Sequence, residues 1–235
     1  MAVNLNYTLP QQKIEYPDSD GEPMAESDFQ RDVLMYAVAA LSRFFADRPD
    51  VYVSGNMFVY YQQGDPESVV APDVFVVFGV AKRKRYSYRL WEEGGKAPDF
   101  VLEITSSATH AKDQGAKRGI YSFLGVREYF QYDPTADYLE PPLQGLRLSG
   151  RNYDAVPTRT LPEGTLVVHS QVLGLELRTD STSGDLRFFD PASKQVLPSY
   201  DEAETRAEQE AAARRAAEEE VERLRAELER LKGRD

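Results

Sequence analysis

Two carboxylates stand in stretches of the sequence that otherwise have the composition of buried strands. Asp73 follows Pro72 at the start of the apolar run 74–78, and Glu103 lies in the middle of the run 100–104. Burial of an unpaired carboxylate costs several kcal/mol of free energy, so each of these two residues is expected to have a partner that compensates its charge. Asp73 could cap a turn after proline, and Glu103 could pair with a nearby arginine. Two carboxylates on adjacent central strands favour a second explanation, because like charges held close together are unfavourable unless a cation neutralises them.

The composition narrows the identity of such a cation. The chain has no cysteine, which excludes a disulfide framework, a thiolate zinc site and a cysteine nucleophile. Its two histidines argue against a multi-histidine site, and we expect His110 to be a surface or capping residue and His169 to be structural. Oxygen ligands remain, which favours Mg²⁺, Mn²⁺ or Ca²⁺. We therefore expect Mg²⁺ or Mn²⁺ as the cofactor.

Two further charged residues could complete this metal site. Glu26 lies at the start of a predicted helix, where the helix dipole already accounts for an acidic residue. Lys117 lies 14 residues after Glu103 on the following helix and four residues after Asp113. Lys117 could form an i,i+4 ion pair with Asp113, or it could place its ammonium beside the metal. There it would orient a water molecule or stabilise a pentacovalent phosphate.

One segment of the chain is both basic and aromatic. Lysine and arginine contact phosphates and tyrosine stacks on bases, so this segment predicts DNA as a partner. The alternative is a solvated loop that balances the surrounding acids. Because the segment follows the strand that begins at Asp73, we expect it to emerge near the carboxylates. Its residues are Lys82, Arg83, Lys84, Arg85, Tyr86, Tyr88 and Arg89, with no acid between Gly79 and Trp91.

The net charge of the chain is acidic, and its distribution matters. With 28 Lys and Arg against 39 Asp and Glu, the net charge is −11, which argues against non-specific coating of nucleic acid. Residues 200–235 carry −4 of this charge. Some of the remaining acids would sit where a divalent cation neutralises them, so the net charge is compatible with cleavage of DNA.

Helices and strands alternate along the first 134 residues. A helix is predicted to begin at Ser27, which forms a capping box with Gln30, and to end at Arg48-Pro49-Asp50. The unbroken apolar runs that carry Asp73 and Glu103 are typical of strands covered on both faces, at the centre of an α/β sheet. The expected elements are helices at 27–48 and 110–125 and strands at 51–61, 68–80, 97–107 and 126–132.

The remaining sequence divides into two parts. Residues 135–198 predict a small β-rich flank, in which turns separate the candidate strands Leu146–Leu148, Leu166–Val168, Leu173–Leu177 and Leu186–Phe189. From Tyr200 onward alanine, glutamate and arginine dominate, and apolar residues recur at alternating spacings of three and four, which is a heptad pattern. This segment is either a solvated helical tail or a coiled coil that associates two chains. We favour the coiled coil, although Glu210 and Arg214 interrupt its apolar stripe.

Four separated blocks of the sequence resemble a bacterial family of restriction endonucleases called Uma-two, within the PD-(D/E)XK nuclease superfamily. The blocks are PMAESDFQRDVLMY at 23–36, APD at 71–73, PDFVLEITS at 98–106 and DQGAKRGIYSFLGVREYFQYDP at 113–134. The resemblance covers about residues 10–180. It implies a four-stranded mixed sheet flanked by helices, and metal-dependent cleavage of phosphodiester bonds. It also implies a site built from Asp73 and Glu103, with Glu26 as the acid of the helix.

The sequence departs from the superfamily pattern at one position. The pattern places a lysine two residues after the acid, where this chain has Thr105. Lys117 would then have to serve as a lysine that has migrated to the adjacent helix. This departure keeps open an alternative in which the fold is a catalytically impaired module that binds DNA or protein. A third hypothesis, a carboxylate-pair glycosidase, is weaker because the single Trp91 does not lie on a strand.

We therefore expect an α/β protein with a restriction-endonuclease-like mixed central sheet flanked by helices. Its predicted parts are an N-terminal lead-in at 1–22, a PD-(D/E)XK nuclease-like domain at 23–198 and a C-terminal helix or coiled coil at 199–235. The expected function is that of a Mg²⁺-dependent DNA endonuclease. It would form a homodimer through the C-terminal helix, with the nuclease domain as a second candidate surface. No apolar stretch approaches the length of a membrane span and no secretory signal is evident, so we expect a cytoplasmic location.

Overall fold

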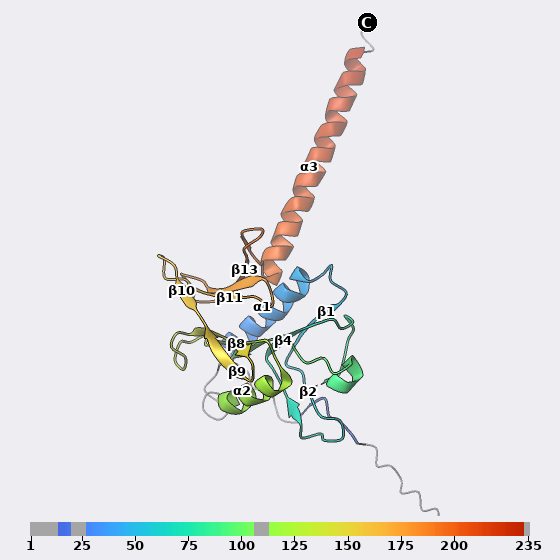
Figure 1. Cartoon of the computed structure of the whole chain (residues 1–235). Coiled ribbons are helices and arrows are strands. Elements are labelled where there is room, and N and C mark those ends of the chain that lie inside the picture. Colours follow the sequence, from blue (N-terminus) through green and yellow to red (C-terminus); the bar gives the residue numbers. More distant parts are fainter. Residues whose placement is uncertain (1–13, 20–26, 106–112, 233–235) are drawn as a thin grey trace, which may run out of the picture.

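The computed structural model describes residues 14–19, 27–105 and 113–232 (Figure 1). The helices are α1 (Asp28–Phe44), α2 (Asp113–Leu124) and α3 (Tyr200–Lys232), with a short 3-10 helix at Leu90–Glu93. The first seven strands are β1 (Val51–Gly55), β2 (Val59–Tyr60), β3 (Val69–Val70), β4 (Val74–Phe78), β5 (Tyr88–Arg89), β6 (Phe100–Ile104) and β7 (Glu128–Tyr132). The others are β8 (Leu143–Ser149), β9 (Asn152–Val156), β10 (Thr158–Thr160), β11 (Leu166–Ser170), β12 (Leu175–Thr179), β13 (Leu186–Asp190) and β14 (Gln195–Val196).

The central sheet is mixed and has six strands in the order β1-β4-β6-β7-β8-β9. Strands β6 and β7 run parallel, and the other neighbours run antiparallel. All five residues of β6 and of β7 are buried, which confirms the prediction that the unbroken apolar runs form the centre of an α/β sheet. The expected four-stranded sheet is present as β1-β4-β6-β7, and the hairpin β8–β9 extends it.

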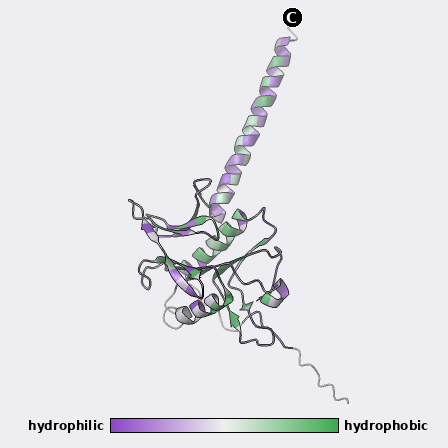
Figure 2. Ribbon diagram, viewed as in Figure 1, coloured by the Kyte–Doolittle hydropathy of each residue, from purple (hydrophilic) through white to green (hydrophobic). Residues whose placement is uncertain are grey.

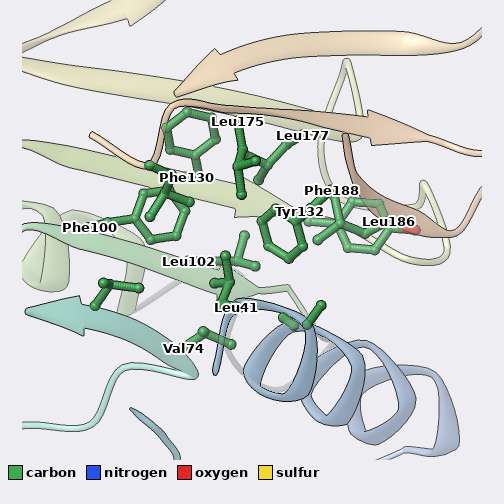
Figure 3. Packing of buried hydrophobic residues seen from close by; sticks show 14 of the residues in the cluster. Leu41, Val74, Phe100, Leu102, Phe130, Tyr132, Leu175, Leu177, Leu186 and Phe188 are labelled. Carbon is green, nitrogen blue, oxygen red and sulfur yellow. The ribbon is translucent and has the colours of Figure 1, made fainter. Parts of the chain in front are cut away.

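Each face of the central sheet is covered by a different layer. One apolar cluster joins α1 and the five-stranded sheet β10–β14 to the central strands. Figure 3 shows Phe100 and Phe130 from neighbouring central strands close to Leu175, and Leu41 of α1 on the other side of the cluster near Leu102 and Val74. The other cluster joins the opposite face to α2 and to the small sheet β3-β2-β5. Alternate residues of β6 and β7 therefore face different layers.

Local sequence signals explain where the elements begin and end. The predicted capping box is confirmed, since the backbone N–H of Gln30 donates to the side chain of Ser27 and the Gln30 side chain accepts from the Ser27 backbone. Helix α2 ends before Gly125, which adopts a positive φ of 76°. The predicted strands of the flank are present as β8, β11, β12 and β13. Strands β5, β9, β10 and β14 were not predicted: β5, β10 and β14 have only two or three residues, and β9 has two buried residues among five.

A buried glutamate joins the two large sheets. Glu128 of β7 is fully buried, and its carboxylate accepts hydrogen bonds from Arg147 at 2.8 Å and from the Ser170 hydroxyl at 2.5 Å. The backbone N–H groups of Gln171 and Val172 donate to the same carboxylate. Four donors of this kind satisfy a charge that would otherwise be very unfavourable in the interior.

Helix α3 leaves the body of the protein as a single projecting element (Figure 1). Its first turn is fixed by a reciprocal cap between Ser199 and Glu202 and by the ion pair of Glu202 with Arg187. Figure 2 shows that hydrophilic residues dominate its surface, with apolar bands between them. None of the helices in the described part of the chain combines the length and apolar character that a membrane span needs.

Candidate functional site

Asp73 and Glu103 lie side by side at one end of the central sheet. Asp73 immediately precedes β4, whose first residue Val74 pairs with Leu102 of β6, so Asp73 stands opposite Glu103. The Oδ2 atom of Asp73 accepts a hydrogen bond of 2.7 Å from the backbone N–H of Ile104. The carboxyl group of Glu103 is a charged neighbour of the Asp73 carboxyl. The structure thus brings together the two carboxylates on which the sequence argument rests.

Backbone contacts with the turn after β1 fix the position of Asp73. The backbone N–H of Asn56 lies 3.1 Å from the carbonyl oxygen of Asp73 and 3.2 Å from that of Pro72. Asn56 adopts a positive φ of 46°, which turns this N–H toward the two carbonyls. Gly55 allows the close approach, because a Cβ atom at this position would lie 2.3 Å from the Asp73 carbonyl oxygen. The Gly55-Asn56 pair is therefore a positioning element of the site.

Two residues of α2 hold the carboxylate of Glu103. The Nζ atom of Lys117 lies 2.9 Å from Oε2 of Glu103 and 3.4 Å from the Ala71 carbonyl oxygen. The hydroxyl of Tyr121, one helical turn further on, donates to Oε1 of Glu103 at 2.5 Å. Of the two positions that the sequence allowed for the Lys117 ammonium, an ion pair with Asp113 or a place beside the carboxylates, the structure has the ammonium beside Glu103. Thr105 is buried at the end of the strand and donates its backbone N–H to the Tyr132 carbonyl.

The electrostatics of the pair favour a proton or a cation between the carboxylates. Burial and then the neighbouring charge of Glu103 raise the pKa of Asp73 well above its ordinary value, although Lys117 and the N–H of Ile104 act in the opposite direction. Burial and Glu103 likewise raise the pKa of Tyr121, which keeps its hydroxyl a donor. A proton or a divalent cation at the Asp73 carboxyl would therefore relieve the repulsion between the two carboxylates.

The donor set fits a hard divalent cation bound by oxygen ligands. Asp73 and Glu103 would supply carboxylate oxygens from neighbouring strands, which suits Mg²⁺ or Mn²⁺. Within the described ranges, no group of three or more Asp, Glu, His or Cys side chains is arranged to hold an ion. Glu26 and His110 lie outside the described residues. The start of α1 does lie at this end of the sheet, since Gln30 donates to the Ile104 carbonyl at 3.4 Å.

Sequence reasoning missed two polar residues at the site. Tyr121 could have been found from its i,i+4 spacing to Lys117. Gln131 of β7 stands beside Glu103 in the register of the parallel pair, so both side chains lie on the face covered by α2. Gln131 is 7 % exposed, and its amide nitrogen has no hydrogen-bond partner among the described residues. A polar residue in an apolar strand, the signal that identified Glu103, also applies to Gln131.

The basic segment does not emerge beside the carboxylates, and that expectation was wrong. Asp73 precedes β4 and the segment follows it, so a strand of about 17 Å separates their starting points. Several of its side chains also serve the fold. Lys82 donates to the Phe45 carbonyl at the end of α1, and Arg85, 2 % exposed, pairs with Glu93.

The remaining basic residues of the segment differ in whether an ion pair holds the side chain. Arg83 also pairs with Glu93, and Arg89 pairs with Glu92. Lys84 is exposed and forms no ion pair within the described part of the chain. Together, Lys82, Arg83, Lys84 and Arg85 line a surface hollow of about 470 Å³. His169, expected to be structural, is exposed on β11 and contributes its backbone carbonyl to Arg147.

Comparison with known proteins identifies the family. The family described as "Uma2: Putative restriction endonuclease" matches residues 4–180 of this chain. The chain belongs to this family. The resemblance read from the four sequence blocks is thereby confirmed, and the Uma2 match spans both carboxylates, Lys117 and the basic segment.

Solved structures include a Uma2-like neighbour. It is described as a putative nuclease belonging to DUF820, from Anabaena variabilis, and is 16% identical with a TM-score of 0.41. The match covers 60% of this chain and 74% of that chain. A comparison with curated proteins returns no match.

Proposed function

We propose that this Uma2 protein is a metal-dependent DNA endonuclease of the restriction type. The observation that carries the proposal is the meeting of Asp73, Glu103 and the Lys117 ammonium at one end of the central sheet. Two adjacent carboxylates that could bind a divalent cation, next to the fixed positive charge of Lys117, suit the hydrolysis of a phosphodiester.

The roles of the residues follow from their contacts. Asp73 and Glu103 would hold Mg²⁺ or Mn²⁺, which supplies charge neutralisation at the phosphate and a more acidic water. Tyr121 donates a hydrogen bond to Oε1 of Glu103 and so fixes the orientation of this carboxylate. The Lys117 ammonium lies within reach of a phosphate oxygen that approaches Glu103, and would stabilise the negative charge that develops there.

The surface beside α2 offers a path for DNA on the same side as these residues. A hollow between α2 and the β8–β9 hairpin is lined by Arg118, Arg151 and the exposed Phe123. Arg118 lies on the same helix as Lys117, so α2 contributes to both the site and this hollow, whereas the segment 82–85 lies beyond the far end of β4. Guanidinium groups contact phosphates and an exposed aromatic ring can stack on a base.

Cleavage of plasmid DNA by the purified full chain tests the proposal. Supercoiled plasmid should be nicked or linearised with Mg²⁺ or Mn²⁺ but not with EDTA, and Asp73→Asn and Glu103→Gln should abolish the cleavage. Asp99→Asn is the matched control, because Asp99 accepts a 2.7 Å hydrogen bond from the Phe78 N–H at the other end of the same strand pair. Equal cleavage by wild type and Asp73→Asn would contradict the assignment of the site.

A second function is favoured by one observation. The described residues supply two carboxylates rather than three, and Thr105 occupies the usual place of the lysine. A non-catalytic module that binds DNA would have the same fold. Binding of DNA without cleavage under any divalent metal, unchanged in Asp73→Asn, would favour this function over hydrolysis.

A further inference from the structure

Helix α3 presents apolar side chains that nothing in the described structure covers. It has 33 residues and would span about 50 Å at 1.5 Å per residue. Ala203 is its last partly buried residue, and Val221, Leu224 and Leu228 are 46%, 48% and 55% exposed. A helix of this length that touches the body only at its base gains little from tertiary packing, so a partner along its length would add to its stability.

The positions of the apolar residues fit a two-stranded coiled coil. With Val221 and Leu228 at position a of the heptad, Leu224 and Leu231 occupy position d in the sequence, and Ala217 occupies the preceding d. A β-branched residue at a combined with leucine at d favours a parallel pair of helices. On the N-terminal side the core positions are filled by Glu210 and Arg214, which would interrupt an apolar seam.

The charges that flank this seam specify its direction and register. In a parallel, in-register pair, each g residue faces the e residue five positions later on the other helix. Glu220 would then face Arg225 of the second copy, and Glu227 would face Lys232 of the second copy. An antiparallel pair would set glutamate against glutamate and base against base. Charge complementarity therefore points to one arrangement and to the same chain as the partner.

The isolated helix leaves part of this charge pattern unused. Arg225 and Glu227 form no ion pair within the described part of the chain, although both are exposed. Glu220 pairs with Arg223 at 2.7 Å, and Lys232 pairs with Glu229 at 3.3 Å, both at surface positions where such pairs contribute little. Arg223 and Glu229 lie outside the e and g positions. Glu220 and Lys232 can therefore leave these residues and pair with the second helix at little cost in free energy.

We propose that residues 217–232 of α3 form a parallel, in-register coiled coil with a second copy of this chain. The two folded bodies then lie at the same end of the coiled coil. The base of each helix is fixed to its body by Ser199 and the Arg187–Glu202 ion pair, and about 25 Å of helix separates this base from the seam. If the proposed nuclease function holds, two sites are carried side by side, as cutting both strands of a duplex requires.

Charge exchange in the full chain tests the proposal without any measurement of cleavage. Light scattering coupled to gel filtration should give twice the protomer mass of 26.6 kDa for the wild type. Glu220→Lys with Glu227→Lys, and separately Arg225→Glu with Lys232→Glu, should each weaken dimerisation by about tenfold or more, because like charges then face each other. Mixing the two double variants should restore a dimer that contains one copy of each.

The matched control changes the same charge outside the seam. Glu219→Lys with Glu222→Lys occupies the outer heptad positions f and b, and should leave the dimer intact. A wild type that stays monomeric at all concentrations would overturn the proposal. So would equal weakening in the control and the seam variants, or failure of the mixed double variants to associate.

Cysteine cross-linking tests direction and register. The chain contains no cysteine, so Leu228→Cys introduces a unique thiol at a core position. In a parallel, in-register pair the two copies of residue 228 are neighbours, and their Cα atoms fall within the roughly 4.4–6.8 Å that a disulfide needs. Oxidation should give a covalent dimer for Leu228→Cys but not for the outer variant Glu222→Cys. A dimer by mass that Leu228→Cys fails to cross-link would overturn the parallel register.

Discussion

Substitution of the central aspartate should stabilise the metal-free protein. Asp73→Asn keeps the shape of the side chain and an oxygen that can accept the 2.7 Å hydrogen bond from the Ile104 N–H. It removes a buried negative charge next to Glu103. Two unit charges of the same sign at about 4 Å would repel by about 4 kcal/mol at an effective dielectric constant near 20. The Lys117 ammonium offsets part of the repulsion between Asp73 and Glu103. We expect Asp73→Asn to raise the free energy of unfolding by about 1–3 kcal/mol at about pH 8 in EDTA.

The pH dependence of this effect has a definite sign. Burial and Glu103 raise the pKa of Asp73 above 3.8 in the folded protein, so the folded state retains a proton that the unfolded state releases. The stability of the wild type therefore falls as the pH rises from the unfolded pKa through the raised folded pKa. The amide introduced by Asp73→Asn has no such proton to lose. The advantage of the variant should be present at about pH 8 and should vanish at about pH 4.

Urea unfolding followed by the fluorescence of Trp91 measures these differences. Mg²⁺ should stabilise the wild type and leave Asp73→Asn nearly unchanged, because only a folded state with both carboxylates binds the ion. Asp99→Asn, which loses a partly exposed ion pair with Arg127, should instead be neutral or destabilised by up to about 1 kcal/mol. An Asp73→Asn variant that is less stable than the wild type at about pH 8 in EDTA would refute the reasoning.

Three further predictions concern other parts of the molecule. Gln131→Leu removes a buried amide nitrogen without a partner in the described structure, and should raise the free energy of unfolding by about 1–3 kcal/mol in urea titrations; a loss of stability would mean that the amide is satisfied. Glu128→Gln removes a buried charge that accepts five hydrogen bonds from four residues, and should lower the free energy of unfolding by about 3–5 kcal/mol, with an unchanged value contradicting its role between the sheets. Lys84→Glu should leave both the melting temperature and the salt slope of DNA binding unchanged, because the segment 82–85 lies beyond the far end of β4 from the site; a slope lowered by about 0.9 would place DNA on this segment instead.

Much of the fold could be predicted because its signals are local. The runs around Asp73 and Glu103 are apolar without alternation, and only strands covered on both faces have this composition. Ser27 with Gln30 marks the start of α1 by a bond that spans three residues. Such patterns can be read without knowing the tertiary structure, and the same is true of the heptads in α3.

The rest depends on contacts between distant segments. The segment 82–85 was placed beside the carboxylates because it follows Asp73 closely in sequence, but the intervening strand carries it to the other end of the sheet. The importance of Gln131 depends on its register with Glu103, which no local pattern contains. Strand β9 has only two buried residues, Tyr153 and Val156, and they pack into the clusters on opposite faces of the sheet, so its burial does not alternate. The position of the segment 82–85 and the neighbourhood of Gln131 therefore depend on strand pairing, which spacing in the sequence does not contain.

The close approach at Gly55 has a consequence for how the site could be altered. Asp73 is held by a turn that contributes no charged side chain, only the backbone N–H of Asn56 and the absence of a side chain at Gly55. A single added methyl group, as in Gly55→Ala, would press on the carbonyl of Asp73 and displace Asp73 relative to Glu103. No ionisable residue would be substituted in this variant. A survey confined to charged residues would miss such a change, although the site depends on that empty space as much as on its carboxylates.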